Sequence, residues 1–170
     1  MLKIYTTHYD SPLGGMTMLS DGKALVALWF DGTGLDYHYE EGASMTKIPV
    51  FDETFRWLDL YFSGKKPDFT PLLAPQGTAF RKRVWDMLLA IPYGETMSYG
   101  DIARRFSSRM SAQAVGGAVG HNPIGIIIPC HRVVGADGSL TGYRGGLERK
   151  RWMLELERMS DGRGRSTFMH

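Results

Sequence analysis

The sequence predicts an α/β N-terminal domain, formed by an antiparallel sheet and a helix, followed by a mostly α C-terminal domain with a helix-turn-helix. Three observations predict this fold class. Strand-like segments separated by turn formers fill the first thirty residues, helical periodicity dominates after residue 78, and a segment rich in proline and glycine lies between them. A chain of 170 residues is long enough for one full domain or two small ones.

The N-terminal half is predicted to begin as a β-meander. Its strand-like segments are KIYTTHY, GGMTMLS and ALVALWF, and the turn formers SPLGG and DGK separate them. In the next segment, FDETFRWLDLYF, apolar side chains recur at spacings of four, three and four, which predicts an amphipathic helix over 51–62. Residues 63–77 contain three prolines and two glycines and are predicted to form a linker. We therefore place the N-terminal α/β domain with its linker at 1–77 and the second domain at 78–158.

The C-terminal domain is predicted to begin with three helices. The segment TAFRKRVWDMLLAIP has one apolar helical face, and Pro92 marks its end. Ser98 precedes YGDIARRF with Asp101 three residues on, a weaker form of the capping box, and Ser111 is a plausible cap for AQAVGGAVG. Two short helices joined by a tight turn favour a helix-turn-helix, which can place its second helix against DNA. Many helical pairs of this kind, however, never touch nucleic acid.

The second of these helices has a face almost without side chains. Ala112, Gly116 and Gly120 lie four residues apart, and each interior glycine costs about 1 kcal/mol of helix propensity relative to alanine. Close approach to this backbone must therefore be needed. Either the helix packs against the protein's own elements, or it is a thin helix that fits into a groove.

The remainder of the chain contains the single cysteine. IGIII at 124–128 is predicted to be a short buried strand that leads to Pro129 and Cys130, and GADGS is predicted to form a hairpin-type turn. The last helix, LERKRWMLELER, is expected to alternate exposed charges with the apolar residues Leu147, Trp152, Met153 and Leu156. The polar segment 159–170 is expected to be a disordered tail.

Composition limits the class of protein. A hydrophobic content of 43% and a charged content of 22% are those of a globular protein, and no apolar run approaches the length of a membrane span. One cysteine cannot form an internal disulfide, so a cytoplasmic location is expected. Residues 1–77 carry 6 Lys and Arg against 10 Asp and Glu, whereas 78–157 carry 11 against 7. This asymmetry is compatible with a polyanion bound by the second half, or with ordinary solvated charges.

Cys130 and His131 form a candidate reactive pair. A thiol reacts as its thiolate, so a nucleophilic cysteine needs a base or a positive environment, and histidine is the usual base. Adjacent residues in extended chain point to opposite faces, however, so contact would need a bridging water or a sharp bend. The alternative is a small buried core cysteine. A metal site is not expected, because one Cys and five scattered His show no zinc-ligand spacing.

A more specific signal is the motif PCHRVVG, preceded by GHNPIGII and followed by LTGYRGGLERKRWMLELE. This stretch closely resembles the active-site region of the O6-alkylguanine-DNA alkyltransferases, the methylated-DNA–protein-cysteine methyltransferases. The similarity to this family extends from about Phe80 to Glu157. The resemblance implies a ribonuclease H-like N-terminal domain and a winged-helix C-terminal domain. It also implies direct repair without a cofactor. The protein would bind double-stranded DNA as a monomer through the minor groove, flip out the alkylated guanine and take its alkyl group irreversibly, with O4-alkylthymine as a further substrate.

The resemblance also implies roles for individual residues. Cys130 would be the acceptor nucleophile, His131 its general base acting through a water molecule, and Glu157 the carboxylate that orients the imidazole. Asn122 would tie the recognition helix to the active site, and Tyr99 would donate to the flipped guanine and press on a backbone phosphate.

Further residues would form the pocket and the DNA-binding surface. Tyr143 would line the alkyl pocket, and backbone groups of Cys130 and Val133 would read the exocyclic amine of guanine. The recognition helix, with Ala112, Gln113 and Gly116, would lie against DNA.

Two positions depart from the pattern of the family. Gln113 stands where many members carry an arginine that holds the gap left by the flipped base, and glutamine cannot attract phosphates. Arg144 stands where many members have a small residue beside the alkyl pocket. Its backbone amide could still contact the guanine oxygen, whereas the effect of its side chain on bulky alkyl groups does not follow from the sequence.

Two other functions compete with a suicide alkyltransferase. One is a non-catalytic damage-binding protein of the alkyltransferase-like kind, which lacks the acceptor cysteine, and Cys130 argues against it. The other is a DNA-binding regulator, against which the absence of an evident sensor or dimerisation domain weighs.

Overall fold

The computed structural model describes residues 3–33 and 47–160. The chain forms two compact units: residues through Gln76 together with Pro123–Gly125 make the first, and Gly77–Asn122 together with the residues from Ile126 onward make the second. Within the described residues no helix is long and apolar enough to cross a membrane.

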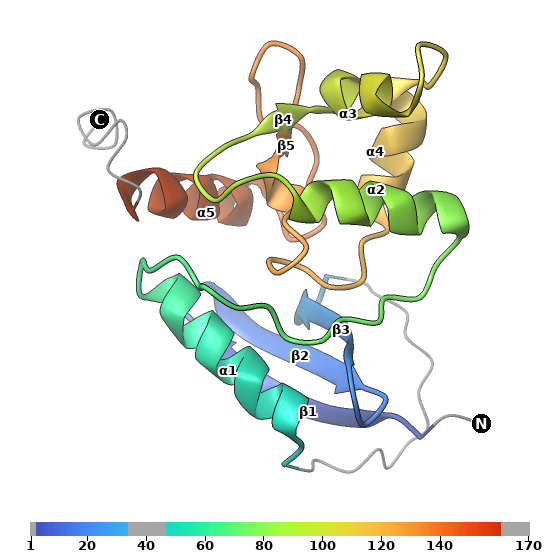
Figure 1. The fold of residues 1–170 in the computed structure, drawn as a ribbon. Helices are drawn as coiled ribbons and strands as arrows, with labels where there is room; N and C mark the ends of the chain where they lie inside the picture. The colour runs from blue at the N-terminus through green and yellow to red at the C-terminus, as the bar shows by residue number, and fades with distance from the viewer. Residues whose placement is uncertain (1–2, 34–46, 161–170) are drawn as a thin grey trace. The chain divides into compact units, whose positions relative to one another are not determined.

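The first unit is an antiparallel meander with one helix beside it (Figure 1). Its strands, in the order predicted, are β1 (Tyr5–Ser11), β2 (Gly14–Ser20) and β3 (Leu25–Phe30). In β2, Met16 and Met18 are fully buried while Thr17 between them is less so, and Leu19 and Ser20 at the end of the strand are both buried. The predicted meander is therefore confirmed, and its buried face forms part of the core.

The predicted amphipathic helix is also present, as α1 (Pro49–Phe62). It begins two residues earlier than predicted because Pro49 occupies its first turn, where the missing N–H costs no hydrogen bond. Phe51 and Leu58 are buried, whereas the rings of Phe55 and Phe62 pack against Tyr9 of β1. Aromatic contacts thus hold the helix to the sheet.

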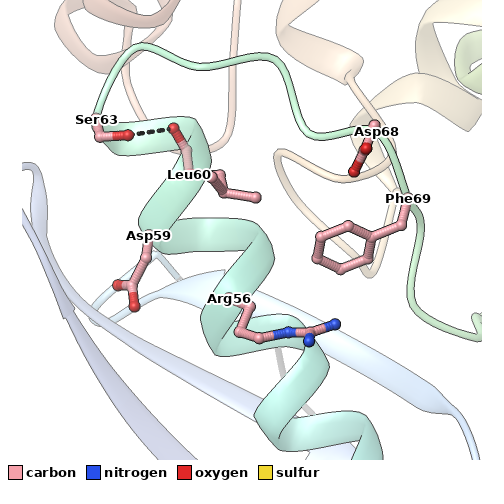
Figure 2. A pocket seen from close by; sticks show the side chains of 6 residues that line it. All are labelled: Arg56, Asp59, Leu60, Ser63, Asp68 and Phe69. Atoms are coloured by element: carbon pink, nitrogen blue, oxygen red, sulfur yellow. Dashed lines mark hydrogen bonds between the residues drawn. The ribbon is translucent and has the colours of Figure 1, made fainter.

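The segment predicted as a linker is bound to the sheet in its central part. The Leu25 amide of β3 donates to the Leu72 carbonyl at 2.8 Å, and the Ala74 amide donates to the Leu25 carbonyl at 2.8 Å. Between α1 and this segment lies an open cavity of about 620 Å³ (Figure 2), beside which the Arg56 guanidinium lies over the Phe69 ring. Residues 63–76 therefore belong to the first unit.

The second unit is mostly helical (Figure 1). Its elements are α2 (Ala79–Leu89), β4 (Met97–Ser98), α3 (Tyr99–Phe106), α4 (Ala112–Gly120), a 3-10 helix (Cys130–Arg132), β5 (Val133–Val134) and α5 (Leu147–Ser160). The predicted capping box of Ser98 and Asp101 is present, and Ser111 caps α4 as predicted. The indole of Trp85 donates to the Ala118 carbonyl at 2.9 Å, which ties α2 to α4.

The strand predicted at 124–128 is wrong. Ile124 forms only an isolated bridge with Leu28, and Ile126 has a φ of 67°, in the left-handed region that β-branched residues avoid. A single residue in this conformation breaks an extended strand, although the segment is as buried as predicted. The chain then enters the 3-10 helix, so that Cys130 and His131 lie on a tight turn.

The pattern predicted for the last helix is wrong in part. The buried face of α5 consists of Lys150, Met153, Leu154 and Glu157, whereas Leu147 is 44% exposed. Two charged residues thus occupy the inward face at helical spacing. Of the tail expected at 159–170, Met159 and Ser160 belong to α5, and 161–170 lie outside the described residues.

Candidate active site

Cys130 lies on the wall of a cavity of about 270 Å³ in the second unit. The cavity is lined by Tyr99, Gly116, Val119, Gly120, Asn122, Cys130, Gly142, Tyr143 and Arg144. A Cβ on Gly116 would lie 3.8 Å from the Tyr99 ring, and a Cβ on Gly120 would meet nothing within 4 Å. Because these contacts are loose, packing within the unit does not account for the bare face of α4. Part of that face borders the cavity instead.

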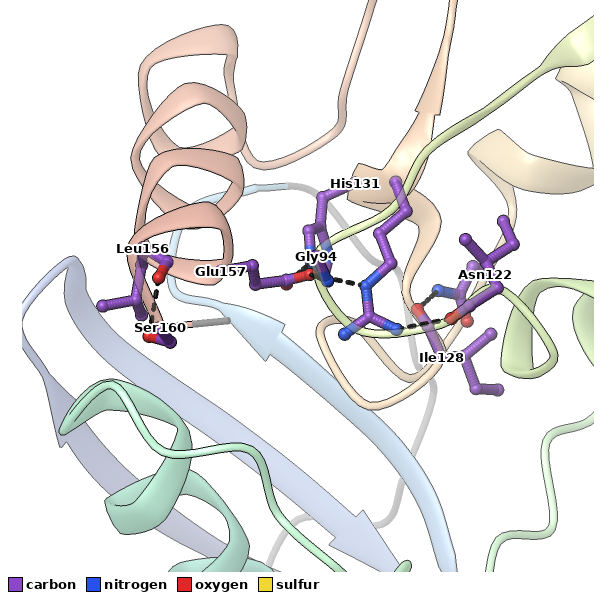
Figure 3. A network of polar contacts seen from close by, with 9 residues as sticks. Gly94, Asn122, Ile128, His131, Leu156, Glu157 and Ser160 are labelled. Atoms are coloured by element: carbon purple, nitrogen blue, oxygen red, sulfur yellow. Dashed lines mark hydrogen bonds and ion pairs between the residues drawn. The ribbon is translucent and has the colours of Figure 1, made fainter. Parts of the chain in front are cut away.

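Glu157 connects the last helix to the 3-10 helix that carries Cys130 (Figure 3). Its Oε2 lies 2.5 Å from Nε2 of His131, and its Oε1 accepts from Nε of Arg132 at 2.7 Å. The Gly94 amide donates to the same Oε1 at 3.2 Å. His131 and Glu157 are both fully buried, so the carboxylate is held by three partners away from solvent.

The surroundings of Glu157 and His131 favour a charged carboxylate beside a neutral imidazole. Against the opposing effect of burial, His131 and Arg132 lower the pKa of Glu157 to about 2, so the carboxylate is ionised. Burial lowers the pKa of His131, and Arg132 and Lys150 act in the same direction, against Glu157. Near neutral pH the imidazole is therefore neutral, which is the form that can accept a proton. Arg132 supplies the positive charge that balances Glu157.

Asn122 links α4 to the segment that precedes Cys130. Its side-chain amide donates to the Ile128 carbonyl at 2.8 Å (Figure 3). Burial raises the pKa of the Cys130 thiol, while hydrogen bonding by Asn122 and the charges of Lys150 and Arg144 oppose that rise. The thiol is thus predominantly protonated at rest and needs a base to react.

A second set of contacts lies around Tyr99, which lines the cavity. The Thr141 hydroxyl donates to the Tyr99 hydroxyl at 3.1 Å. Val133, buried in β5, pairs with Met97 of β4, which directly precedes the helix that carries Tyr99. Tyr143 lines the cavity, and burial raises the pKa of its phenol well above the ordinary value, so the phenol is neutral.

Gln113 lies at one end of α4, and the side chain of Arg144 reaches the other end. Gln113, beside Ala112 at the N-terminus of the helix, is exposed and lies outside the residues that line the cavity. Arg144 donates from its guanidinium to the Gly120 carbonyl at 2.7 Å, at the C-terminal end. Its side chain therefore bridges the loop before α5 and α4.

Sequence reasoning missed two charged residues of the site, Arg132 and Lys150. Arg132 bonds Glu157 and also donates to the Ile91 carbonyl at 2.9 Å, and its guanidinium lies over the Tyr93 ring. The sequence signal for Lys150 is its position in α5, because Lys150, Met153, Leu154 and Glu157 have the spacing of a single helical face.

No group of three or more potential metal ligands occurs in the described part of the chain.

Both halves of the chain match known proteins. Residues 79–159 match the model of the 6-O-methylguanine DNA methyltransferase DNA-binding domain, and residues 4–74 match its ribonuclease-like domain. Methylated-DNA–protein-cysteine methyltransferases from Haemophilus influenzae and Mycobacterium bovis are 42% and 47% identical, over 94% and 89% of this chain and 89% and 92% of their own. The crystal structure of Mycobacterium tuberculosis OGT in complex with DNA superposes with a TM-score of 0.81 and 43% identity, covering 92% of this chain and 94% of that one.

These matches confirm the predicted fold class, an N-terminal ribonuclease-like domain with an antiparallel sheet followed by a helical DNA-binding domain. The family models together span most of the chain, and the relatives are matched over nearly their whole length. The chain therefore belongs to the 6-O-methylguanine DNA methyltransferase family, whose curated members are named methylated-DNA–protein-cysteine methyltransferases.

Proposed function

We propose that this DNA alkyltransferase repairs O6-alkylguanine in double-stranded DNA by moving the alkyl group irreversibly to its own Cys130. Each molecule acts once, O4-alkylthymine is a second substrate, and α3 and α4 deliver the flipped base from the minor groove. The observation that carries the proposal is the position of Cys130 on a cavity that Gly116 and Gly120, from the bare face of α4, also line. A helix with so little side-chain bulk lets a base edge approach closely.

The relay behind Cys130 supports a base-assisted reaction. Glu157 is bonded to Nε2 of His131, so the proton that leaves the thiol arrives at Nδ1, through a water molecule. The thiolate attacks the alkyl carbon; the S–C bond forms, the C–O6 bond breaks and its electron pair goes to guanine, and the proton that His131 took from the thiol is then returned through water to the guanine. Glu157 remains ionised and stabilises the imidazolium that forms.

Other residues position the base and open its path. Tyr99 donates to the guanine ring and presses on the backbone phosphate, while Asn122 keeps the end of α4 in register with the Cys130 segment. Tyr143 contacts the alkyl group, and the backbone of Val133 reads the exocyclic amine. We also propose that the protein acts as a monomer in the cytoplasm, where a lone thiol stays reduced.

The test is to incubate the protein with a duplex containing O6-methylguanine and to measure the intact mass and the modified peptide. A gain of one methyl group per molecule on the peptide that contains Cys130, with restored guanine in the DNA, is expected. Binding without any mass change would identify a non-catalytic damage-binding protein instead.

Replacing Gln113 by arginine is expected to accelerate methyl transfer from duplex DNA. A longer, charged side chain at this exposed position of α4 can fill the gap in the stack and attract phosphates. The gain should be on the order of fivefold, as expected of about 1 kcal/mol of added contact. Single-turnover kinetics measure it, with Gln76→Arg adding the same charge away from α4. An equal gain in both variants, or none in Gln113→Arg, would contradict the role of this position.

Replacing Arg144 by serine is expected to favour bulky alkyl groups. The Arg144 guanidinium bridges to the Gly120 carbonyl beside the cavity, so its removal widens the space near Cys130. The ratio of benzyl to methyl transfer from matched duplexes should rise on the order of tenfold, the scale on which pockets discriminate small apolar groups. Because any change in thiol ionisation affects both substrates alike, the ratio isolates the steric effect. An unchanged ratio would show that Arg144 does not limit alkyl size.

A further inference from the structure

The Tyr99 hydroxyl has one hydrogen-bond partner in the described part of the chain, the hydroxyl of Thr141. Thr141 donates to the phenol oxygen at 3.1 Å, in a part-buried contact between the loop before α5 and the first residue of α3. Because the phenol oxygen is the acceptor in this bond, the proton of Tyr99 stays free for another partner. Tyr99 lines the cavity of Cys130, so that partner can be a group bound in the cavity.

Thr141 is held so that its hydroxyl faces Tyr99. Its carbonyl accepts from Nζ of Lys150 at 3.1 Å, which fixes its backbone. A Cβ placed on Gly135 would lie 3.3 Å from the methyl carbon of Thr141, so this methyl group fits beside a residue that has no side chain. A β-branched side chain has few rotamers, so the placement of the methyl group also fixes the hydroxyl. The donor is therefore in position before any base arrives.

Tyr99 is held at its backbone and at its ring. Ser98 caps α3 and pairs with Val134 between β4 and β5, which anchors the backbone of Tyr99. A Cβ on Gly116 would lie 3.8 Å from two carbons of the Tyr99 ring, so α4 packs beside the ring without crowding it. The freedom that remains is rotation of the hydroxyl proton, and donation by Thr141 occupies one side of the phenol oxygen.

The direction of this proton affects the chemical step of the proposed transfer. Guanine gains the electron pair of the broken C–O6 bond, so negative charge develops on the base in the transition state. A hydrogen bond donated to the base is therefore stronger in the transition state than in the bound ground state. A phenol that accepts from Thr141 is polarised by that bond and donates more strongly in turn. Loss of the Thr141 donor should thus slow transfer more than it weakens DNA binding.

We infer that Thr141 is a positioning residue for alkyl transfer, whose hydroxyl directs the proton of Tyr99 toward the flipped base and strengthens its donation. The inference rests on the proposed transfer to Cys130. Thr141 is not among the residues that line the cavity, so it acts through Tyr99. Both hydroxyls keep their protons throughout, because the proton that reaches guanine comes from the Cys130 thiol through His131.

The experiment compares Thr141→Val, which has nearly the same shape but no donor, with Thr141→Ser, which keeps the donor. Single-turnover methyl transfer from an O6-methylguanine duplex is measured over a range of protein concentrations, which separates the maximal rate from the half-saturating concentration. In Thr141→Val the maximal rate should fall about threefold to tenfold, the factor that one hydrogen bond is worth, while the half-saturating concentration stays within about twofold. Thr141→Ser should keep most of the rate. Ser139→Ala removes a hydroxyl from an exposed position of the same loop and should keep the wild-type rate.

Tyr99→Phe provides the second arm of the experiment. In this background Thr141→Val should have no further effect on the maximal rate, because the phenol through which Thr141 acts is gone. Additive losses in the double variant would overturn the inference. A loss in Thr141→Val that is confined to the half-saturating concentration would also overturn it, since that result is expected of a loop anchor. Thr141→Ala serves as a second variant without a donor if the valine variant does not fold, and its results have the same meaning.

A measurement without DNA separates this inference from the proposed function. Tyrosine labelled with carbon-13 at Cζ reports the bonding of each phenol oxygen by NMR, and Tyr99→Phe identifies the Tyr99 signal. Thr141→Val should shift that signal, whereas Thr141→Ser should not, and an unshifted signal in Thr141→Val would overturn the inference. Failure of the wild-type protein to take a methyl group from DNA would instead reject the proposed function, and the Tyr99 signal would still decide whether Thr141 directs the phenol.

Discussion

Replacing Cys130 by serine is expected to abolish methyl transfer while leaving affinity for an O6-methylguanine duplex within about twofold, a difference well below 1 kcal/mol. Serine has nearly the same shape, so the cavity, the Asn122 bond to Ile128 and the bare face of α4 remain in place. A neutral His131 cannot ionise an alcohol to any useful extent, and an alcohol is a much weaker nucleophile toward a saturated carbon.

The measurement combines intact mass after incubation with the methylated duplex and fluorescence anisotropy for binding. Circular dichroism melting of the free variant is the control for folding, and a change within about 1 kcal/mol is expected for this near-isosteric substitution. A methyl group found on any other peptide of the variant would show that Cys130 is not the acceptor. Loss of binding together with transfer would instead assign the cysteine to DNA recognition.

The parts of the fold that the sequence predicted are those that local patterns determine. The meander follows from strand-like segments separated by turn formers, and α3 follows from a capping box whose two partners are three residues apart. These signals depend on neighbours in sequence, so no tertiary contact was needed to recognise them. The segment 124–128 lacked such a signal, because an apolar run is compatible with a strand or with any buried chain, and the left-handed Ile126 is not visible in the residue types.

Less of the candidate site than of the fold could be predicted from local sequence patterns. The residues alone left Cys130 and His131 as an adjacent pair of uncertain contact, and only the resemblance joined them to Glu157. Neither the residue pattern nor the resemblance predicted the partners of the buried charges. Glu157 is bonded by Arg132 from the 3-10 helix, and Lys150 donates to backbone carbonyls. A pattern that counts every charged residue as exposed cannot place two of them on the buried face of α5. Such placements are set by partners distant in the chain.

Replacing Glu157 by glutamine is expected to slow methyl transfer by about 10²- to 10⁴-fold, the range that loss of an oriented general base produces. The glutamine oxygen can still accept from Arg132 and Gly94, as Oε1 of Glu157 does. Its NH₂ group then faces Nε2 of His131 and donates to it. That contact requires the tautomer with a proton on Nδ1, which is the nitrogen that must accept the proton from Cys130.

Single-turnover kinetics at several pH values measure this effect, and Glu155→Gln is the matched control because Glu155 lies two residues away on the exposed face of α5. Burial lowers the pKa of His131, so wild-type activity should persist somewhat below pH 6.5 and fall as the imidazole is protonated. Glu157 is the main group that opposes this lowering, so the acid limb of the Gln variant should move to still lower pH while its plateau is reduced. A simple loss of folded protein would not move that limb.

The same substitution should also reduce stability in a pH-dependent way. Glu157 has a pKa of about 2 in the folded protein against an ordinary value of 4.5, so it contributes stability that is fully present above pH 4.5 and is lost as the pH falls toward 2. A shift of this size corresponds to about 3 kcal/mol, in line with the cost of removing one partner from a buried ion pair and leaving Arg132 uncompensated.

Urea unfolding at pH 7 should show that difference in unfolding free energy between wild type and Glu157→Gln, and the difference should shrink when the comparison is repeated near pH 3. A difference that stayed constant across this range would mean that packing, rather than the charge of Glu157, holds α5 to the Cys130 segment.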